Sequence, residues 1–344
     1  MPELPEVEHL RRSLDPWIVG AHIISLRVDR RGVVQLAPGE RRNDEAFERA
    51  LGVGSTIAAT LRHGKQMAIE LATGRVFVVQ LGMTGSLTLE VEAPARGVES
   101  RHRHVRWEIL PARSIPTKEH AEPTPSGPSK LTHKHARAGA SRSATHTAAG
   151  RLVFRDPRRF GGIVAYRSVD ALREAWSRLG PDALTIDGAE LFGRLQSSRR
   201  PVKAALLDQS TLAGVGNIYA DEGLHAAQIH PLASAHALGR EEVERLAVEL
   251  RRILGCAVDR GGSTLRDYRD AFGRPGDAVQ VHRVYGRAAQ PCLSCGTPLL
   301  GTTLQARTTV FCPVCQDLST FQNRESGRSP RPASTPRPEA RKPR

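Results

Sequence analysis

Four cysteines near the carboxyl end of the chain have the spacing of a metal site. They form two Cys-x-x-Cys pairs, Cys292 with Cys295 and Cys312 with Cys315, and 16 residues separate the pairs. Gly and Pro residues in and after the pairs favour tight turns. Two such turns can place four thiolates at the corners of a tetrahedron around Zn²⁺, with residues 299–311 between them as a β-hairpin. Because four protein ligands close the coordination sphere, we expect one structural zinc.

The amino terminus carries residue types that could do covalent chemistry. Met1 precedes Pro2, a small residue of the kind after which the initiator methionine is removed, and its removal exposes a secondary amine. An α-amino group has a pKa of about 8, so part of it is neutral and nucleophilic at physiological pH. Such an amine can attack the anomeric carbon of a sugar while Glu3 or Glu6 supplies a proton. By themselves these residues are more typical of an exposed terminus.

Composition favours a polyanionic partner. The chain has 344 residues, a formal net charge of +14 and a sequence pI of about 10.4, and chains this basic most often bind nucleic acid. Much of the charge lies in residues 111–150, with a net charge of +4, and in residues 324–344, with +5. Neither segment has a core pattern, so we predict a flexible insertion and a disordered tail. They are either solvated linkers or additional phosphate contacts for scanning DNA.

The same sequence argues against secretion and membrane insertion. The first six residues are acidic and contain no apolar signal region. No apolar stretch approaches the roughly 20 residues of a membrane helix. Paired cysteines in such a chain favour metal over disulfides. The fifth cysteine, Cys256, lies in an apolar helical segment, and we expect it in the core.

The elements that position these residues follow from periodicity. Residues 3–14 predict a helix with one apolar face, which Pro16 ends. Short β-branched runs between residues 18 and 110 indicate an antiparallel sandwich or barrel, and residues 151–154 resume it. The expected strands are 21–28, 56–61, 67–71, 76–81 and 86–91. From residue 170 the helical period returns, with helices expected at 170–179, 189–195, 202–209, 218–227 and 240–260.

Five motifs along the chain resemble the bacterial formamidopyrimidine-DNA glycosylases of the Fpg/Nei family. They are PELPEVE at 2–8, LGMTGSL at 81–87, DPRRFG at 156–161, LAGVGNIYA at 212–220 and the four-cysteine module. Their order and spacing agree with the family over residues 2–316, apart from the insertion. The resemblance implies a bifunctional enzyme of base excision repair. Such an enzyme removes oxidised purines, notably 8-oxoguanine and formamidopyrimidines, and then cuts the strand by β,δ-elimination.

The resemblance also implies roles for the catalytic residues. Pro2 would attack C1′ of the damaged nucleoside and form a Schiff base, and Glu3 would be the acid that assists base loss and ring opening. Glu6 would be a second carboxylate that organises the amino-terminal helix. Lys65, on a β-hairpin, would donate a proton in β-elimination, although the next residue is Gln66 where the family usually has Tyr.

Arg307, on the predicted zinc hairpin, matches an arginine that reaches the lesion phosphate and is assigned to δ-elimination. An arginine is a poor proton donor because its pKa exceeds 12. We therefore expect electrostatic binding of the phosphate to be the larger part of its role.

DNA contacts carry over from the family in the same way. Met83, Arg158 and Phe160 would fill the space left by an extruded base, hydrogen-bond the orphaned partner base and wedge the stack. The remaining matched positions are His102, Arg199, Lys203 and Asn217. An arginine follows His102 where the family usually has Asp, and Arg199 stands where many members have Lys. Residues 264–281 match the loop that covers an everted 8-oxoguanine.

We therefore predict an α+β fold with two main domains. An amino-terminal β-sandwich with a leading helix would span residues 2–165 and include the insertion at 111–150. A helical helix–two-turn–helix domain would span 170–285, followed by a zinc hairpin at 286–320 and the tail at 324–344. The expected partner is double-stranded DNA containing oxidised bases, bound in the cleft between the domains. The resemblance further implies a monomer in the bacterial cytoplasm, associated with the nucleoid.

Two other functions compete with this interpretation. One is a Nei-like glycosylase for oxidised pyrimidines, against which Met83, Arg158 and Phe160 argue. The other, from a different class, is a non-catalytic zinc-ribbon protein that binds damaged DNA. The joint presence of Pro2, Glu3, Lys65 and Arg307 disfavours it. A substitution at Pro2 or Glu3 is the feature that would distinguish such a protein.

Overall fold

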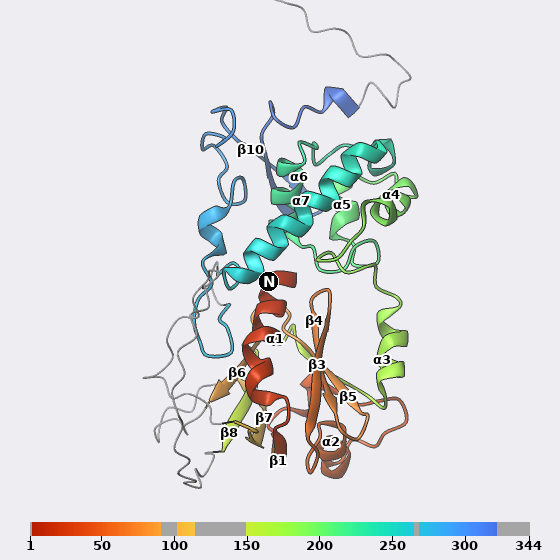
Figure 1. Cartoon of the computed structure of the whole chain (residues 1–344), viewed down its shortest axis with the longest axis vertical. Coiled ribbons are helices and arrows are strands. Elements are labelled where there is room, and N and C mark those ends of the chain that lie inside the picture. Colours follow the sequence, from red (N-terminus) through yellow and green to blue (C-terminus); the bar gives the residue numbers. More distant parts are fainter. Residues whose placement is uncertain (1, 91–101, 114–148, 265–267, 322–344) are drawn as a thin grey trace, which may run out of the picture.

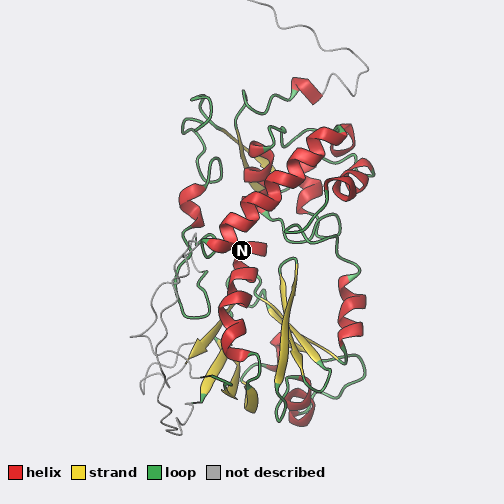
Figure 2. Ribbon diagram, in the orientation of Figure 1, coloured by secondary structure: helices red, strands yellow, loops and turns green. Residues whose placement is uncertain are grey.

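The computed structural model describes residues 2–90, 102–113, 149–264 and 268–321. Most of the predicted insertion, the predicted tail and residues 265–267 lie outside this part of the chain. One half of the molecule holds most of the strands together with the first three α-helices, and the other half holds the remaining α-helices and a small hairpin; the amino terminus lies where the halves meet (Figures 1 and 2). Among the described residues, the helices are too short or too polar to cross a bilayer.

Two sheets form the sandwich. The first has the order β1-β7-β8-β6 and the second β2-β9-β5-β4-β3, and of these pairs only β2 with β9 is parallel. Trp107 and Phe77 stack between the sheets with ring centroids 5.4 Å apart, in a core of alternating buried positions. The strands are β1 (His22–Val28), β2 (Val34–Gln35), β3 (Ile57–His63), β4 (Gln66–Leu71), β5 (Val76–Gln80), β6 (Ser86–Glu90), β7 (Arg103–Leu110), β8 (Gly150–Arg155) and β9 (Gly162–Tyr166).

Helix α1 (Leu4–Ile18) packs on both halves. Leu4 belongs to the core of the helical half, whereas later residues such as Val7 are buried against the sheets. The prediction that Pro16 ends this helix is wrong, because the helix continues to Ile18. Pro16 lies in the last turn, where proline removes only one intrahelical hydrogen bond, and full burial of Ile18 favours the extra residues.

The structure confirms the five helices predicted after residue 170, of which the first packs on the sandwich. Their ends differ from the expected ones by at most three residues. The helices are α3 (Val169–Trp176), α4 (Gly188–Gln196), α5 (Val202–Leu207), α6 (Asn217–Ala226) and α7 (Arg240–Asp259). Helices α4, α6 and α7 pack around a second apolar core. One short helix, α2 (Asp44–Ala50), begins after the capping residue Asn43. It was not predicted, because seven residues give too weak a periodic signal.

The placement of Cys256 in the core is wrong. Its side chain is exposed on α7, although Leu254, Ala257 and Val258 around it are buried. A helix with one apolar face leaves its remaining positions in solvent, and position 256 falls on that outer face.

Candidate active site and DNA-contact residues

Glu3 lies at the amino end of α6. Its carboxylate accepts hydrogen bonds from the backbone N–H groups of Gly216 at 2.8 Å, Ile218 at 3.0 Å and Tyr219 at 3.4 Å. A Cβ atom on Gly216 would lie 2.3 Å from Cδ of Glu3, so only glycine leaves room for this contact. Free N–H groups and the helix dipole make this helix end favourable for a carboxylate. The glycines of residues 212–220 thus bring α6 to the amino terminus.

Glu6 is buried and joins three segments of the chain. Its oxygens accept from the backbone N–H of Glu3 at 2.7 Å, the hydroxyl of Tyr219 at 2.8 Å and the backbone N–H of Ser263 at 2.7 Å. Burial and the neighbouring Glu3 raise the pKa of Glu6, while these three donors oppose that shift. In addition, the hydroxyl of Tyr268 donates to the carbonyl of Glu6 at 2.9 Å. This carboxylate therefore ties α1 to α6 and to the segment beyond Gly262.

Lys65 occupies the two-residue turn between β3 and β4. The turn docks on the helical half, because the N–H of Gly64 donates to Asp182 at 2.7 Å and Arg62 forms an ion pair with the same carboxylate. A Cβ atom on Gly64 would lie 2.9 Å from Cβ of Ala213, and Gly64 has a φ of +55°. Glycine is needed there for both reasons. The turn thus projects Lys65 toward the amino terminus of α1.

The surroundings of Lys65 show that the predicted catalytic residues converge. Burial lowers the pKa of Lys65, the charge of Arg307 lowers it further, and the charges of Glu3 and Glu6 raise it. These four residues come from α1, the β3–β4 turn and the carboxyl-terminal hairpin. Pro2 is buried beside them at the start of α1. A lysine with a lowered pKa exchanges protons more readily near neutral pH.

Gln66 shows how this chain fills the place where the family usually has Tyr. Its side-chain oxygen accepts a hydrogen bond from the indole N–H of Trp176 at 2.7 Å. Trp176 also stacks on His63, with ring centroids 5.6 Å apart. Gln66 is therefore hydrogen-bonded to the last residue of α3, and the β3–β4 turn that carries Lys65 keeps its conformation.

Arg307 begins β11 (Arg307–Phe311), which pairs with β10 (Leu300–Leu304) as the predicted hairpin. The side chain of Arg307 is exposed. The next carbonyl, of Thr308, accepts from the side-chain amide of Asn217 at 2.9 Å and from Nζ of Lys203 at 3.1 Å. Two predicted DNA-binding residues thus hold the strand that carries Arg307.

Lys203 is fully buried. Its Nζ lies 2.6 Å from a carboxylate oxygen of Asp221 and donates to the hydroxyl of Thr309 at 2.8 Å as well as to Thr308. Burial lowers the pKa of Lys203 and raises that of Asp221, and their mutual attraction opposes both shifts. All three ammonium protons have partners within the protein. A contact to phosphate would require this arrangement to open.

Met83, Arg158 and Phe160 lie on the surface. Met83 is 37% exposed and Phe160 is 59% exposed, so both apolar side chains are accessible from solvent. The guanidinium of Arg158 lies 4.9 Å from the ring centroid of Phe160. His102 and Arg199 are exposed as well. These positions are accessible to a large partner such as DNA.

The four predicted zinc ligands come together. Their sulfur atoms lie within 4.8 Å of one another, with 3.5 Å between Cys295 and Cys312 and 4.0 Å between Cys292 and Cys315. A zinc–sulfur distance of about 2.3 Å separates tetrahedral ligands by about 3.8 Å, so the cluster fits zinc. Backbone N–H groups two and three residues on donate to Cys292 and Cys312 at 3.4 Å, which stabilises thiolates. The zinc is structural, as predicted.

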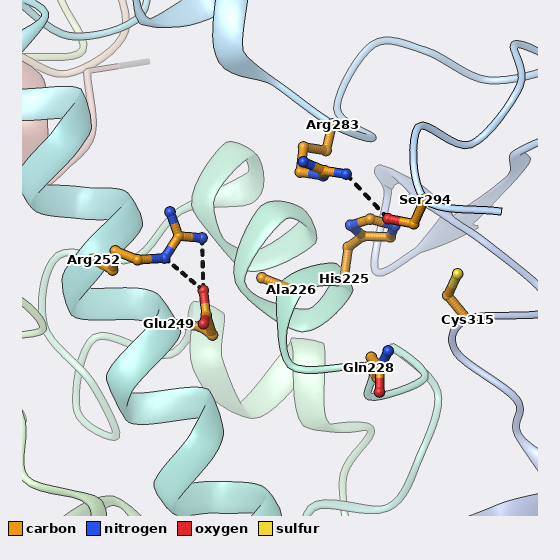
Figure 3. Close-up of a pocket in the computed structure, with 8 residues that line it drawn as sticks. All are labelled: His225, Ala226, Gln228, Glu249, Arg252, Arg283, Ser294 and Cys315. Atoms are coloured by element: carbon orange, nitrogen blue, oxygen red, sulfur yellow. Dashed lines mark hydrogen bonds and ion pairs between the residues drawn. The ribbon is translucent and has the colours of Figure 1, made fainter. Parts of the chain in front are cut away.

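A polar pocket lies beside this cluster (Figure 3). His225, Ala226, Gln228, Glu249, Arg252, Arg283, Ser294 and Cys315 line it. Nε2 of His225 lies 3.6 Å from the sulfur of Cys292, so this ring contacts a zinc ligand from α6. Cys315 is the single predicted site residue in the lining. The pocket is therefore separate from the convergence of Glu3, Glu6 and Lys65.

Several residues that build the site were not predicted. Asp182 binds the turn that carries Lys65, Asp221 pairs with Lys203, and Ser263 donates to Glu6. No local sequence pattern marks these three residues. Tyr219 and Asp156, by contrast, lie inside two of the recognised motifs. Their positions in these motifs could have identified them as functional residues, although the sequence could not show which residues they contact.

Family comparisons agree with the motifs. The model described as the formamidopyrimidine-DNA glycosylase N-terminal domain matches residues 1–163, and the model of its H2TH domain matches residues 179–269. A formamidopyrimidine-DNA glycosylase of Thermomicrobium roseum is 39% identical over 92% of this chain and all of the relative. That of Thermus thermophilus is also 39% identical, over 92% of this chain and 98% of the relative.

Solved structures agree as well. A Lactococcus lactis Fpg bound to DNA with an abasic site has a TM-score of 0.72 and 28% identity, covering 92% of this chain and 99% of that one. The MutM (Fpg) protein of Thermus thermophilus has a TM-score of 0.68 and 33% identity, covering 96% and 100%. The motifs, both family models and relatives matched along almost their whole length lead to one conclusion: this chain belongs to the formamidopyrimidine-DNA glycosylase family.

Proposed function

We propose that Pro2, once Met1 is removed, is the nucleophile of this enzyme, a DNA glycosylase for oxidised purines that also has AP lyase activity. The observation that carries the assignment is the convergence of Glu3, Glu6, Lys65 and Arg307 around the start of α1. Such a cluster supplies an acid, a proton-exchanging lysine and a phosphate-binding cation beside one amine.

In the first step the Pro2 nitrogen bonds to C1′ while the bond from C1′ to the damaged base breaks. The displaced base takes up the proton that the Pro2 amine releases. Glu3 then donates a proton to O4′ as the C1′–O4′ bond breaks, which opens the sugar ring and leaves a Schiff base between Pro2 and C1′. The three N–H groups of α6 hold the Glu3 carboxylate in one orientation, which favours a reactive geometry. Glu6 keeps α1 in place through Tyr219 and Ser263.

In the second step the Schiff base makes a C2′ proton acidic, and its loss expels the 3′ phosphate. We assign Lys65 to proton transfer in this β-elimination, since its lowered pKa suits that role. Arg307 binds the lesion phosphate and promotes the subsequent δ-elimination through its charge. Lys203 and Asn217 place Arg307 by holding the Thr308 carbonyl, and Asn217 also contacts phosphate.

DNA is held open by Met83, Arg158 and Phe160, and His102 and Arg199 contact its backbone. This trio favours oxidised purines over the pyrimidines of the Nei-like alternative. The exposure of Met83 and Phe160 supports a role in contacting DNA. We further propose that the enzyme is a monomer acting on chromosomal DNA in the bacterial cytoplasm, at the nucleoid, and that residues 111–150 and 324–344 add non-specific phosphate contacts.

Borohydride trapping tests the assignment of Pro2. Duplexes containing 8-oxoguanine or an oxidised pyrimidine are incubated with wild type, Pro2→Gly and Glu3→Gln, after mass spectrometry has shown that Met1 is absent. We expect an adduct on 8-oxoguanine with wild type, a weaker one with Pro2→Gly, whose glycine retains an α-amine, and very little with Glu3→Gln. An adduct on the pyrimidine alone would support the Nei-like alternative. No adduct on either duplex would contradict the lyase mechanism.

A further inference from the structure

A buried carboxylate without a cation organises the DNA-facing surface of the sandwich. Asp156, directly after β8, is completely buried, and among the described residues it forms no ion pair. Its side chain accepts from the hydroxyl of Thr84 at 2.6 Å and from the backbone N–H groups of Gly161 at 2.7 Å and Arg158 at 3.3 Å. Burial of an unpaired carboxylate is unfavourable unless such donors compensate it.

Each of these donors belongs to a turn that carries a DNA-facing side chain. Thr84 follows Met83, Gly161 follows Phe160, and Arg158 donates its own N–H. The Thr84 hydroxyl oxygen also accepts from the Arg158 N–H at 3.2 Å, so it links the two turns directly. The carboxylate of Asp156 and the hydroxyl of Thr84 therefore connect the two turns that carry these three side chains.

The backbones of the two turns touch. A Cβ atom on Gly82 would lie 2.5 Å from the nitrogen of Gly161, and one on Gly161 would lie 2.3 Å from the carbonyl oxygen of Gln80. Because no side chain separates the turns, their relative position depends on backbone contact and on the Asp156 hydrogen bonds. We expect the turns to move as one body.

The same residue reaches His102. The backbone N–H of Asp156 donates to the carbonyl of His102 at 3.2 Å, and the N–H of Arg159 donates to the carbonyl of Asp156 at 3.3 Å. His102 and Arg159 have φ values of +75° and +58°, which are unfavourable for residues with a Cβ atom. Such conformations persist where surrounding contacts enforce them, and they concentrate at functional sites.

We infer that Asp156 and Thr84 are positioning residues that fix Met83 relative to Arg158 and Phe160. The side chain that fills the space left by the extruded base and the side chain that contacts the orphaned base would then enter the DNA together. This inference rests on the roles proposed for those three side chains. Asp156 is fully buried, and Thr84 acts through its hydrogen bonds to Asp156 and Arg158, so we assign neither residue a contact with the base or the reacting atoms. Their loss should therefore affect steps that need an opened duplex and spare those that do not.

Thr84→Val tests this inference, because valine keeps the shape of threonine and removes the hydroxyl. Thr84→Ser restores the hydroxyl. Thr88→Val on β6 is a matched control, since the Thr88 hydroxyl has no hydrogen-bond partner among the described residues. The substrates are 8-oxoguanine opposite C, 8-oxoguanine opposite A, and a single strand with an abasic site, which has no partner base. Fluorescence of 2-aminopurine beside the lesion reports opening of the stack.

We expect Thr84→Val to slow excision opposite C roughly tenfold, the effect of about one lost hydrogen bond, and to bring the C-to-A ratio toward one. The 2-aminopurine signal should rise more slowly, cleavage of the abasic single strand should stay within about twofold of wild type, and Thr84→Ser should restore all three readouts. Equal losses on all substrates, or an unchanged ratio opposite C and A, would overturn the inference. The proposed function fails separately, if wild type forms no adduct in the trapping experiment.

Discussion

Two hairpins bring a cation to the same site, and they are held in different ways. The β3–β4 hairpin that carries Lys65 belongs to a five-stranded sheet, and its turn docks on Asp182. The β10–β11 hairpin that carries Arg307 is a sheet of only two strands, and β10 is largely exposed. It depends on the cysteine cluster, and on Lys203 and Asp221, for its position.

The difference follows from how much apolar surface each hairpin buries. Strand β4 of this hairpin and its neighbour β5 are buried over most of their length, whereas β3 is only partly buried, so the hairpin that carries Lys65 is anchored in the core through β4. An isolated pair of strands is at best marginally stable in water. A metal and a buried ion pair can supply the missing constraint. We therefore expect Lys65 and Arg307 to respond differently to the same kinds of perturbation.

Removal of zinc should produce the largest difference in response between the two hairpins. Without the metal, β10 and β11 are no longer held by the cysteine cluster, and Arg307 loses its position. The sheet that carries Lys65 remains folded. We expect Cys295→Ser, or chelation of wild type, to lower excision of 8-oxoguanine on the order of 100-fold or more. Activity is measured together with zinc content, and circular dichroism follows the sandwich. Cys256→Ser, on the exposed face of α7, is the control, and zinc-free protein with full activity would refute the comparison.

Asp182→Asn should weaken the other hairpin. It removes one charge from a pair in which the side chains of Arg62 and Asp182 are 8% and 12% exposed, and it weakens the acceptor for Gly64. Arg62 keeps its ion pair with Glu8 at 2.9 Å, so we expect the variant to lose about 1–2 kcal/mol, the cost of weakened hydrogen bonds to a charged group. Urea unfolding should show this loss, with slower β-elimination and unchanged zinc content. Asp170→Asn, whose carboxylate is 88% exposed, should change stability by less than about 0.5 kcal/mol; an equal effect of both variants would count against the docking.

Lys203→Met should act on the Arg307 hairpin through its ion pair. It leaves Asp221 buried and uncompensated, so we expect a loss of about 2–3 kcal/mol. In Lys203→Met/Asp221→Asn the buried charge is gone, while the Asn side-chain oxygen can still accept from Val310 N–H. Stability should recover in the double variant, measured by urea unfolding. The fraction of δ-elimination product should stay low in both, because Thr308 has lost one donor; full recovery of that fraction would exclude a positioning role.

The smallest effect should appear in the pH dependence of β-elimination. We propose Lys65 as the proton donor, so activity should be lost as pH rises through its pKa. Burial and the charge of Arg307 lower the pKa of Lys65, and the loss should therefore occur at a lower pH than for an ordinary lysine. Arg307→Ala removes one lowering charge and therefore shifts the loss to higher pH. The rate of β-cleavage at an abasic site between pH 6 and 11 measures this shift. A shift to lower pH would have the wrong sign for the proposed proximity.

Much of the fold could be predicted because it depends on local patterns. Short β-branched runs between turns marked the strands between residues 18 and 110, and the helical period marked five helices within three residues of their ends. The errors at Pro16 and Cys256 have a common origin. Burial of Ile18 and the outward face of α7 are properties of packing, which local propensity does not contain.

The candidate site, like the fold, has features that the local sequence determines and features that only packing determines. Chemical type and spacing determine what Cys292 and its partners can bind, and they make Pro2 a possible nucleophile, because these are properties of side chains and of short segments. Which residues meet is decided by tertiary structure alone. Glu3 reaches the end of α6 more than 200 residues away, and Lys203 turns inward to Asp221 instead of outward to solvent. Such contacts form only when two cores pack around α1, and the burial and charge that result set the pKa values on which the chemistry depends.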